Sequence, residues 1–285
     1  MNRVEYGSKV GIVCCSNGQK AYYNDKLKIL NDTLCQLGLI PVFSNYIYEK
    51  NDVFSGSAKE RSEALMGFYK NPEIKAIFDI SGGDIANELL EELDFDVIYK
   101  SDKKFFGYSD LTTIINAIYT KTGKSSVLYQ VRNLIYDYRE RQIRDFKESI
   151  INGKDDLFSI SYKFVQGSYM EGIVVGGNIR CFLKLAGTAY FPNLKGKIIL
   201  LEGRGGLIPQ MVTYLSQLKQ IGAFKQVSGI LLGTFTELEK EKIYMEELIK
   251  NYVDSDMPIA VTGDIGHGMD SKGIEIGKRM VLFKE

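Results

Sequence analysis

The chain has 285 residues, with 36 basic and 36 acidic side chains, 45% hydrophobic residues and only 5 prolines. This composition excludes a disordered chain, and the zero net charge excludes a global field that draws the protein to nucleic acid or to anionic membranes. No two of the 4 cysteines have C-x-x-C spacing and one histidine is too few for a usual zinc site, so we expect no metal and no cofactor. Because the N-terminal apolar run is too short for a signal peptide, and no apolar run of about 18 residues occurs, we expect a cytoplasmic protein without a membrane partner.

The first half of the chain alternates between strand and helix patterns. Strands are predicted at 9–15, 38–43, 74–80 and 104–107, and helices at 22–37, 57–69, 85–90 and 111–119. Short connections between such elements indicate a parallel sheet with helices on both faces. The charged segment 133–152 is predicted to be a helix with a solvated face. We therefore expect an N-terminal α/β domain at 1–152.

The periodicity fades between Gly153 and Gly167, and a crossing segment is placed at 153–168. A second domain is expected at 169–285, with strands at 172–175, 197–201, 228–235, 257–262 and 280–283. A Gly-Gly-Asn turn at 176–178 leads into a short helix to Ala186, and longer helices are predicted at 207–221 and 237–252. The second half is therefore also α/β, with a sheet of its own.

The segment 74–90 reads as a strand, a tight turn and the start of a helix. The turn is Ser81-Gly82-Gly83-Asp84. At such a junction the helix start offers unpaired N–H groups, and two glycines let a ligand approach the backbone closely, so an anion or the oxyanion of acyl transfer would be stabilised. The alternative is a turn that only reverses the chain. Nucleotide binding at these glycines is disfavoured, because neither a G-x-G-x-x-G nor a P-loop pattern is present.

Two side chains at predicted strand ends have the chemistry of acid–base catalysis. His267, the only histidine, follows the strand at 257–262 in a glycine-flanked loop, where it has little to pack against and is free to swing. Its ordinary pKa suits proton transfer near neutrality, which favours a general base over a structural histidine. Glu202 ends the strand at 197–201, where it can orient an imidazole; the alternative is an acid that pairs with Arg204 or caps the following helix.

The chain resembles the LD-carboxypeptidase family of serine peptidases, which includes the microcin-immunity peptidases. The resemblance covers nearly the whole length and rests on the Gly-Gly turn together with SAKERSEAL at 57–65, LDFDVI at 93–98, FFGYSDLT at 105–112, GGNIRCFLKLAGT at 176–188, KGKIILLEG at 195–203, QLKQIGAFKQVSGILLGTF at 217–235 and GDIGHG at 263–268.

The resemblance implies a flavodoxin-like N-terminal domain, a C-terminal α/β domain with a partly barrel-like sheet, and a Ser-Glu-His triad at their interface. It implies a small substrate, either a murein peptide cleaved between an L- and a D-configured centre or a peptidyl-nucleotide antibiotic, and it implies no metal and a homodimer. The zero net charge, in turn, leads us to expect no nucleic acid partner. Glu202 and His267 occupy the acid and base positions. The family usually places its nucleophilic serine three residues after the Gly-Gly pair, and this chain has Ala86 there.

A methyl group cannot attack a carbonyl, so Ala86 has three explanations. The first is a natural branch that only binds peptides or that uses Ser81 or Ser109 instead. The second is a substitution made to trap a ligand, and the third is water activated by His267 and Glu202. The rival function is accordingly a peptide-binding protein without catalysis.

The remaining expectations concern the substrate pocket. Gly83 and N–H groups near Ala86 are expected to form the oxyanion pocket, and Arg204 is a candidate for holding a terminal carboxylate. The residues expected to bind substrate are Gly82, Gly83, Asn87, Tyr108, Ser109, Asp110 and Arg204. The segment 129–132, Tyr-Gln-Val-Arg, stands where many family members have a Gly-Pro pair, and this departure bears on the shape of the pocket.

Overall fold

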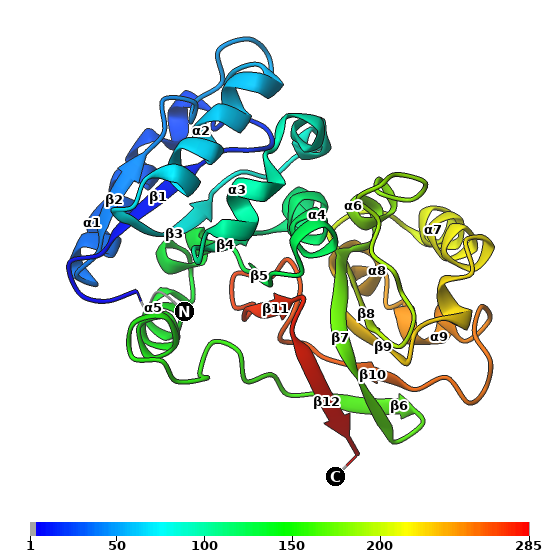
Figure 1. Cartoon of the computed structure of the whole chain (residues 1–285). Coiled ribbons are helices and arrows are strands. Elements are labelled where there is room, and N and C mark those ends of the chain that lie inside the picture. The colour runs from blue at the N-terminus through cyan, green and yellow to red at the C-terminus, as the bar shows by residue number, and fades with distance from the viewer. Residues whose placement is uncertain (1–3, 285) are drawn as a thin grey trace.

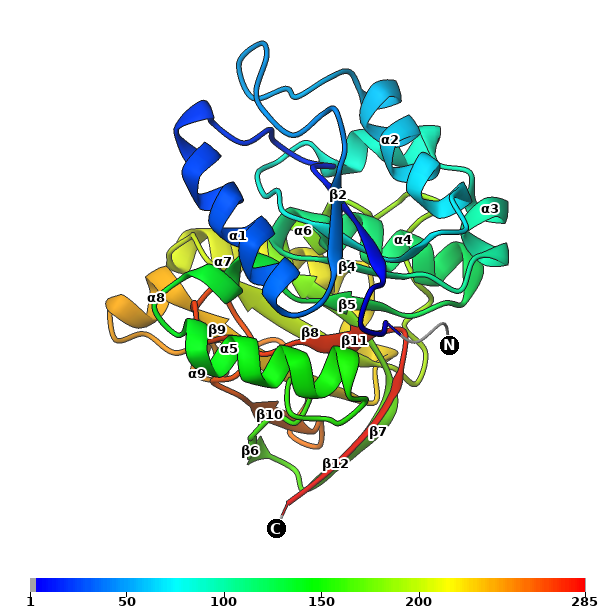
Figure 2. The ribbon, with the colours of Figure 1, turned by 90° about the vertical axis from the view of Figure 1, so that its left-hand side faces the viewer.

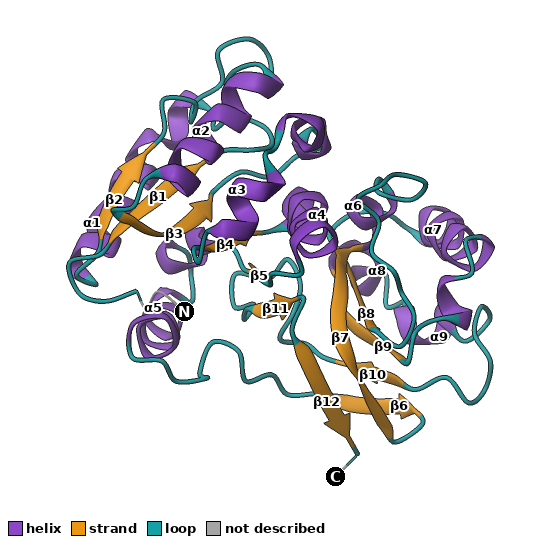
Figure 3. Cartoon of the chain, in the orientation of Figure 1, coloured by secondary structure: helices purple, strands orange, loops and turns teal. Residues whose placement is uncertain are grey.

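The computed structural model describes residues 4–284, which form two six-stranded sheets flanked by helices (Figures 1 and 3). The strands are β1 (Lys9–Val13), β2 (Ile40–Phe43), β3 (Ile74–Asp79), β4 (Lys104–Gly107), β5 (Ser126–Leu128), β6 (Lys163–Gln166), β7 (Tyr169–Asn178), β8 (Ile198–Gly203), β9 (Gly229–Phe235), β10 (Ile259–Val261), β11 (Ile274–Ile276) and β12 (Arg279–Phe283). The α-helices are α1 (Asn24–Gln36), α2 (Ala58–Lys70), α3 (Phe95–Lys100), α4 (Thr112–Thr122), α5 (Arg139–Phe146), α6 (Ile179–Leu183), α7 (Ile208–Gln220), α8 (Thr236–Lys240) and α9 (Met245–Ile249). Short 3₁₀-helices are η1 (Ala21–Tyr23), η2 (Ala86–Glu92), η3 (Ser109–Leu111), η4 (Val131–Ile135) and η6 (Ala223–Lys225), and η5 (Lys147–Ile151) is a π-helix. Within residues 4–284, none of the helices combines the length and the apolar character that crossing a bilayer requires.

The first sheet has the strand order β11-β5-β4-β3-β1-β2. Strands β1 to β5 pair in parallel, and β11 joins the edge of the sheet antiparallel to β5. Because the strand order reverses between β1 and β3, the turns after these two strands open onto a common crevice, which is where ligands bind in doubly wound sheets. The predicted parallel α/β arrangement of the first half is therefore confirmed, with β11 contributed by the end of the chain.

The alternation of side chains along the strands places helices on both faces of the first sheet (Figure 2). Val10, Ile12 and Phe78 pack with α1 in one core cluster, whereas Val13 and Ile77 pack with α2 and α4 in another. Successive residues of a strand point to opposite faces, so these apolar runs bury both faces at once. A capping box formed by Ser57 and Glu60 starts α2, at the position where a helix was predicted to begin.

The second sheet has the strand order β12-β7-β8-β9-β10-β6. Its four central strands are parallel, and β12 and β6 close its edges antiparallel. Ile199 and Leu201 of β8 face α7, whereas Ile198 and Leu200 belong to the core cluster that also contains α4 of the first half. Helix α4 thus lies between the two sheets (Figure 1). We call the first sheet with its helices the first lobe and the second sheet with its helices the second lobe; one continuous core joins them.

Two predicted helices have a different form in the structure. Segment 237–252 contains the end of α8 and all of α9, because Lys242 adopts φ +59, a left-handed conformation that interrupts an α-helix. Segment 133–152 consists of the end of η4, α5 and η5, and it is not only a solvated surface. Its Gln142 is buried and donates to the carbonyl of Ser271, so this helix braces the loop that carries His267.

The predicted turn at Gly176-Gly177-Asn178 is a continuation of strand β7. Gly176 has φ +102, and a Cβ atom there would lie 2.2 Å from the carbonyl oxygen of Leu200. The glycine is therefore required for close approach between β7 and β8, and not for a chain reversal. Strands β5, β6 and β11 were not predicted, because three or four residues carry too little periodicity to distinguish a strand from a loop.

Candidate active site

Three side chains from distant parts of the chain form one hydrogen-bonded series at the junction of the lobes. His267 Nδ1 lies 2.7 Å from Glu202 Oε2, and His267 Nε2 lies 3.0 Å from Ser109 Oγ. An ionised carboxylate only accepts hydrogen bonds, so it holds the imidazole proton on Nδ1 and leaves Nε2 free to accept from the serine hydroxyl. This tautomer is the one that a general base needs.

The position of Glu202 follows from the alternation of strand β8. Its side chain continues the face of Ile198 and Leu200, which points toward the first lobe, and it is fully buried. The other carboxylate oxygen, Oε1, accepts no hydrogen bond from the described residues. The hydrogen bonding of the buried carboxylate is therefore concentrated on His267, which favours the orienting role over the alternative in which Glu202 pairs with Arg204.

The loop that carries His267 is held at several points. Gly266 O accepts hydrogen bonds from the Tyr108 hydroxyl and from Ser271 Oγ, and Ile265 O accepts from Thr234 N. The ring of Tyr108 packs against the imidazole with centroids 4.7 Å apart. The expectation that a glycine-flanked loop lets His267 swing is thus wrong, because long-range hydrogen bonds supply the restraint that local sequence lacks.

Ser109 occupies a strained turn between β4 and α4. Its φ is +55, which is uncommon for a residue other than glycine, and it begins the short helix η3 directly after the strand. A serine held in this way at a strand-to-helix turn has its hydroxyl exposed beyond the end of the sheet. The sequence signal was present in the predicted strand 104–107 and helix 111–119, whose junction is also a helix start. The contact with His267 was not visible, because the two residues are 158 positions apart.

The structure does not place Ala86 with His267 and Glu202, and the prediction that residue 86 is the nucleophile position is corrected. The methyl group of Ala86 is fully buried in the core cluster that contains Leu89. Its N–H donates to Asp110 Oδ2 at 2.8 Å. This N–H is therefore already paired and does not belong to an oxyanion pocket, because its donor capacity is used inside the protein.

Asp110, next to Ser109, is fully buried beneath the site and lines neither of the cavities described below. Its carboxylate accepts from Ser16 Oγ at 2.7 Å and from Lys184 Nζ at 2.6 Å, in addition to Ala86 N. Lys184 follows α6 in the second lobe and also donates to Asp84 O at 2.8 Å. The Asp110 carboxylate therefore supports the site from below rather than contacting a substrate, which corrects the expectation that this side chain lines the pocket.

The Gly-Gly turn after β3 is fixed by its neighbours. Gly83 has φ +136, and a Cβ atom there would lie 2.0 Å from Asn17 Oδ1, so only glycine fits. Asn17 follows β1, as expected at the crossover of the sheet, and its Oδ1 accepts from Asp84 N. Ser81 donates its hydroxyl to Asp79 Oδ1 at 2.5 Å, and its Oγ accepts from Ser16 N. This buried hydroxyl supports the turn, whereas the hydroxyl of Ser109 reaches the histidine.

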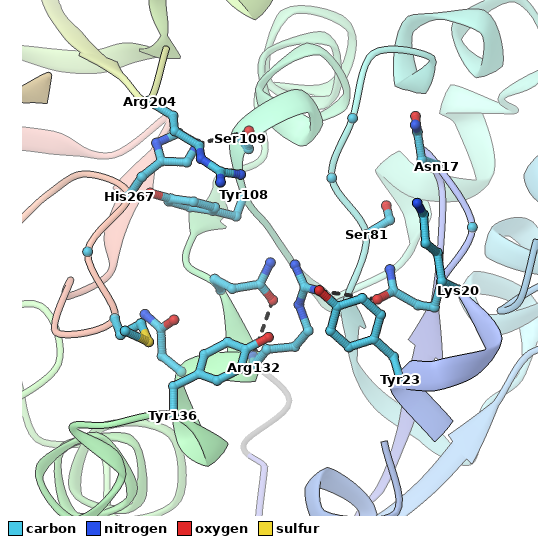
Figure 4. A pocket seen from close by; sticks show the side chains of 18 of the residues that line it. Asn17, Lys20, Tyr23, Ser81, Tyr108, Ser109, Arg132, Tyr136, Arg204 and His267 are labelled. Atoms are coloured by element: carbon cyan, nitrogen blue, oxygen red, sulfur yellow. Dashed lines mark hydrogen bonds between the residues drawn. The ribbon is translucent and has the colours of Figure 1, made fainter. Parts of the chain in front are cut away.

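Two cavities meet at the Ser109–His267 contact. The larger, of about 700 Å³, lies toward the first lobe and is lined by Gly82, Gly83 and Tyr108 among others (Figure 4). The smaller, of about 450 Å³, lies toward the second lobe. Ser109, His267, Gly83 and Arg204 line both. Asn87 is exposed and lines neither, because helix η2 turns it away, so its predicted binding role is not supported.

The tyrosine beside the histidine stays protonated. Burial raises the pKa of Tyr108 well above its ordinary value, and the negative charge of Glu202 raises it further. The hydroxyl is therefore a permanent donor to Gly266 O. Within residues 4–284, no group of three or more His, Cys, Asp or Glu side chains is placed to hold a metal ion.

The fold and the site together define a class of protein, a two-lobed α/β scaffold with a Ser-His-Glu arrangement of the hydrolase type at the junction. Residues 10–129 match the sequence profile of the LD-carboxypeptidase N-terminal domain, and residues 171–282 match that of the LD-carboxypeptidase C-terminal domain. The chain therefore belongs to the LD-carboxypeptidase family, as the sequence motifs indicated.

Individual relatives agree with this assignment. The chain is similar to a putative carboxypeptidase of Treponema pallidum, with 29% identity over 81% of this chain and 76% of the relative. It is also similar to a probable murein peptide carboxypeptidase of Bacillus subtilis, with 26% identity over 87% of this chain and 81% of the relative.

The fold matches that of the microcin C7 self-immunity protein MccF, with a TM-score of 0.87, 20% identity and coverage of 99% of this chain and 98% of that chain. MccF has also been solved in complex with aspartyl sulfamoyl adenosine. The predicted two-domain α/β fold class, with a curled second sheet, is thereby confirmed.

Proposed function

We propose that this protein is a serine-type LD-carboxypeptidase that hydrolyses the amide bond between an L- and a D-configured centre in a small peptide. Ser109 is the nucleophile, His267 the general base and Glu202 the residue that orients the base. The observation that carries the proposal is the continuous series from Ser109 Oγ through His267 to Glu202, with separations of 3.0 and 2.7 Å. The murein peptide carboxypeptidase among the relatives supports a murein peptide as the substrate.

In the first step, Ser109 Oγ attacks the scissile carbonyl while His267 Nε2 accepts the hydroxyl proton. The buried carboxylate of Glu202 stabilises the imidazolium that forms. The imidazolium then protonates the leaving amine, and an acyl ester remains on Ser109. Water, deprotonated by His267, cleaves the ester and restores the serine hydroxyl. Each proton therefore passes through one nitrogen, Nε2.

The tetrahedral oxyanion of each step requires donors beside Ser109. The N–H of Gly83 is the candidate on the first lobe, since Gly83 lines both cavities with Ser109 and donates this N–H to no acceptor among the described residues. The N–H of Asp110, directly after the nucleophile, is the second candidate, in the arrangement common to strand-to-helix nucleophile turns. Arg204 is exposed next to both cavities and is suited to a terminal carboxylate.

The same scaffold accommodates a second substrate class. MccF, whose fold this chain shares, has been solved with an aminoacyl nucleotide analogue, which supports a peptidyl-nucleotide as an alternative substrate. The alternative of a non-catalytic binder was motivated by Ala86, and the contact between Ser109 and His267 supports catalysis over that alternative.

The test is hydrolysis of an L,D-linked tetrapeptide and of a peptidyl-nucleotide by the natural sequence and by Ser109→Ala, His267→Ala and Ala86→Ser. Loss of the nucleophile leaves only the contributions of binding and the oxyanion pocket, so Ser109→Ala is expected to lower kcat by roughly 10⁴-fold or more. His267→Ala is expected to lower kcat by a similar factor, because the general base is lost. Ala86→Ser is expected to add no activity, alone or combined with Ser109→Ala.

Mass spectrometry of the protein quenched during turnover is expected to find the acyl group on the peptide that contains Ser109. Activity that persists in Ser109→Ala, or that arises only in Ala86→Ser, would overturn the assignment of the nucleophile. Binding of both substrates without any turnover by the natural sequence would instead favour the binder.

A further inference from the structure

The larger cavity carries an unbalanced positive charge. Its charged lining residues are Lys20, Arg132, Arg204, Lys240 and, as the single acid, Glu49. Within the described part of the chain, none of the four cations has a carboxylate partner within ion-pair distance, although thirteen other basic groups do. A concave site lined by one sign of charge focuses the field and concentrates ligands of the opposite sign. The cavity is therefore suited to an anionic ligand.

Arg132 is held in place by neutral groups. Its Nη1 donates to Gln19 Oε1 at 3.1 Å, and Gln19, which is buried, donates from Nε2 to Ile80 O at 3.2 Å. Its backbone N–H donates to Gln130 Oε1. Because the anchoring acceptor is an amide and not a carboxylate, the guanidinium is positioned without being neutralised.

The same side chain has unused hydrogen-bonding capacity. Arg132 Nε is buried and has no hydrogen-bond partner among residues 4–284. A guanidinium has five N–H donors in a planar fork that matches the two oxygens of a carboxylate or phosphate. Arg132 lines the cavity, and its Nη2 donates to no acceptor among residues 4–284, so such a group in the cavity would pair with donors that the protein leaves free; this is the second reason to expect an oxyanion here.

The location separates this arginine from the reacting groups. Figure 4 shows Arg204 with His267 and Ser109 on one side of the cavity and Lys20 on the other, with Arg132 between them and next to Tyr23. Lys20 follows β1 and is exposed, so it adds a second positive charge at the rim. A ligand whose scissile carbonyl lies at Ser109 and whose far end lies at Arg132 spans the cavity.

We propose that Arg132 and Lys20 form a distal anion subsite, which binds a carboxylate or phosphate that the substrate carries away from the scissile bond. This inference rests on the proposed hydrolase function and specifies its substrate class, an acyl peptide or nucleotide with a second negative charge. An interaction made equally in the ground state and the transition state acts on KM and leaves kcat unchanged. The subsite is therefore a specificity element and not part of the catalytic series.

The kinetic test uses two L,D-linked tetrapeptides that differ only in one acyl-side group, a free carboxylate or its carboxamide. The natural sequence is expected to have a KM about 10- to 100-fold lower for the carboxylate peptide, because charged hydrogen bonds are lost in the carboxamide. Arg132→Gln is expected to raise KM for the carboxylate peptide to that of the carboxamide, with kcat retained. Arg132→Lys keeps the charge but loses the planar fork of donors. Its KM for the carboxylate peptide is expected to lie between that of the natural sequence and that of Arg132→Gln.

Lys26→Gln is the matched control. Lys26 lies 5.3 Å from the ring centroids of both Tyr23 and Tyr136, beside the cavity, but it does not line it. The variant removes the same charge from the same region, so it reports any long-range electrostatic effect. It is expected to leave the ratio of the two KM values unchanged. An equal KM for the two peptides with the natural sequence would overturn the proposal, as would a preference that survives Arg132→Gln.

A binding measurement separates this proposal from the proposed function and distinguishes the two sources of the anion. Calorimetry with Ser109→Ala, with and without Arg132→Gln, uses the carboxylate peptide, the carboxamide peptide and adenosine monophosphate. Arg132-dependent binding of the carboxylate peptide identifies a peptide carboxylate, and Arg132-dependent binding of adenosine monophosphate identifies a phosphate. Either result supports the subsite, even if the natural sequence hydrolyses nothing. Binding of all three ligands that is indifferent to Arg132 would overturn it.

Discussion

The ion pair between Lys184 and Asp110 is expected to make an unusually large contribution to stability for a single lysine. The Asp110 side chain is 0% exposed and that of Lys184 is 20% exposed, and their charged atoms lie 2.6 Å apart. Breaking a buried pair by removing one partner leaves an uncompensated charge, at a cost of roughly 3–5 kcal/mol. Lys184→Met is expected to lower the free energy of unfolding by about 3 kcal/mol, at the lower end of this range, because Asp110 keeps its hydrogen bonds from Ser16 and Ala86.

Arg180→Met is the matched control. Arg180 lies on α6 and forms an ion pair with Asp84, as Lys184 also does, but its side chain is 43% exposed and no contact with Asp110 is present among the described residues. Exposed pairs contribute about 0–1 kcal/mol, so this variant is expected to change the free energy of unfolding by no more than about 1 kcal/mol. Lys184→Met and Arg180→Met each remove one positive charge from the same region, so the difference between them reports the burial of the ion pair.

The assay is chemical denaturation of the two variants and of the double variant Lys184→Met with Asp110→Asn. If the loss comes from an uncompensated charge, then neutralising residue 110 is expected to recover part of the stability lost in Lys184→Met. Equal stability of Lys184→Met and Arg180→Met would refute the reasoning. So would a double variant that is less stable than Lys184→Met, since the loss would then come from packing and not from charge.

Two further predictions concern the histidine loop and the sheet edge. Tyr108→Phe is expected to lower kcat less than 10-fold, because Gly266 O retains its hydrogen bond from Ser271, whereas Tyr108→Ala also removes the ring beside His267 and is expected to lower kcat further in the same hydrolysis assay. Burial raises the pKa of Glu275, but its hydrogen bonds and ion pairs with Lys104 and Lys278 outweigh this effect, so the pKa is lowered overall. A lowered folded-state pKa contributes stability above the unfolded value of about 4.3 that is lost as pH falls through the folded value. Denaturation is therefore expected to find Glu275→Gln less stable than the natural sequence at pH 7, with the difference narrowing below about pH 5 and disappearing in acid; a constant difference would contradict this explanation.

Local pattern was sufficient for the elements that have strong periodicity or defined caps. The parallel α/β order of the first half, the start of α2 at Ser57 and the location of Glu202 at the end of β8 all follow from the alternation and capping of nearby residues. Pattern alone was insufficient for 237–252, where a left-handed Lys242 divides the predicted helix, and for β11, which is stable only because β5 is available to pair with it.

For the candidate site, too, the sequence predicted one part and the tertiary structure decided the other. By itself the sequence determined which side chains have suitable chemistry, namely a histidine after one strand, a carboxylate at the end of another and serines at two junctions. The tertiary structure alone decided which serine meets the histidine, because that contact joins residues 158 positions apart and depends on the packing of α4 between the two sheets. It also decided that Ala86 is buried beneath the site and that Arg132 remains unneutralised in the cavity. Hydrogen-bond reach and burial are properties of folded distances, which no spacing along the chain specifies.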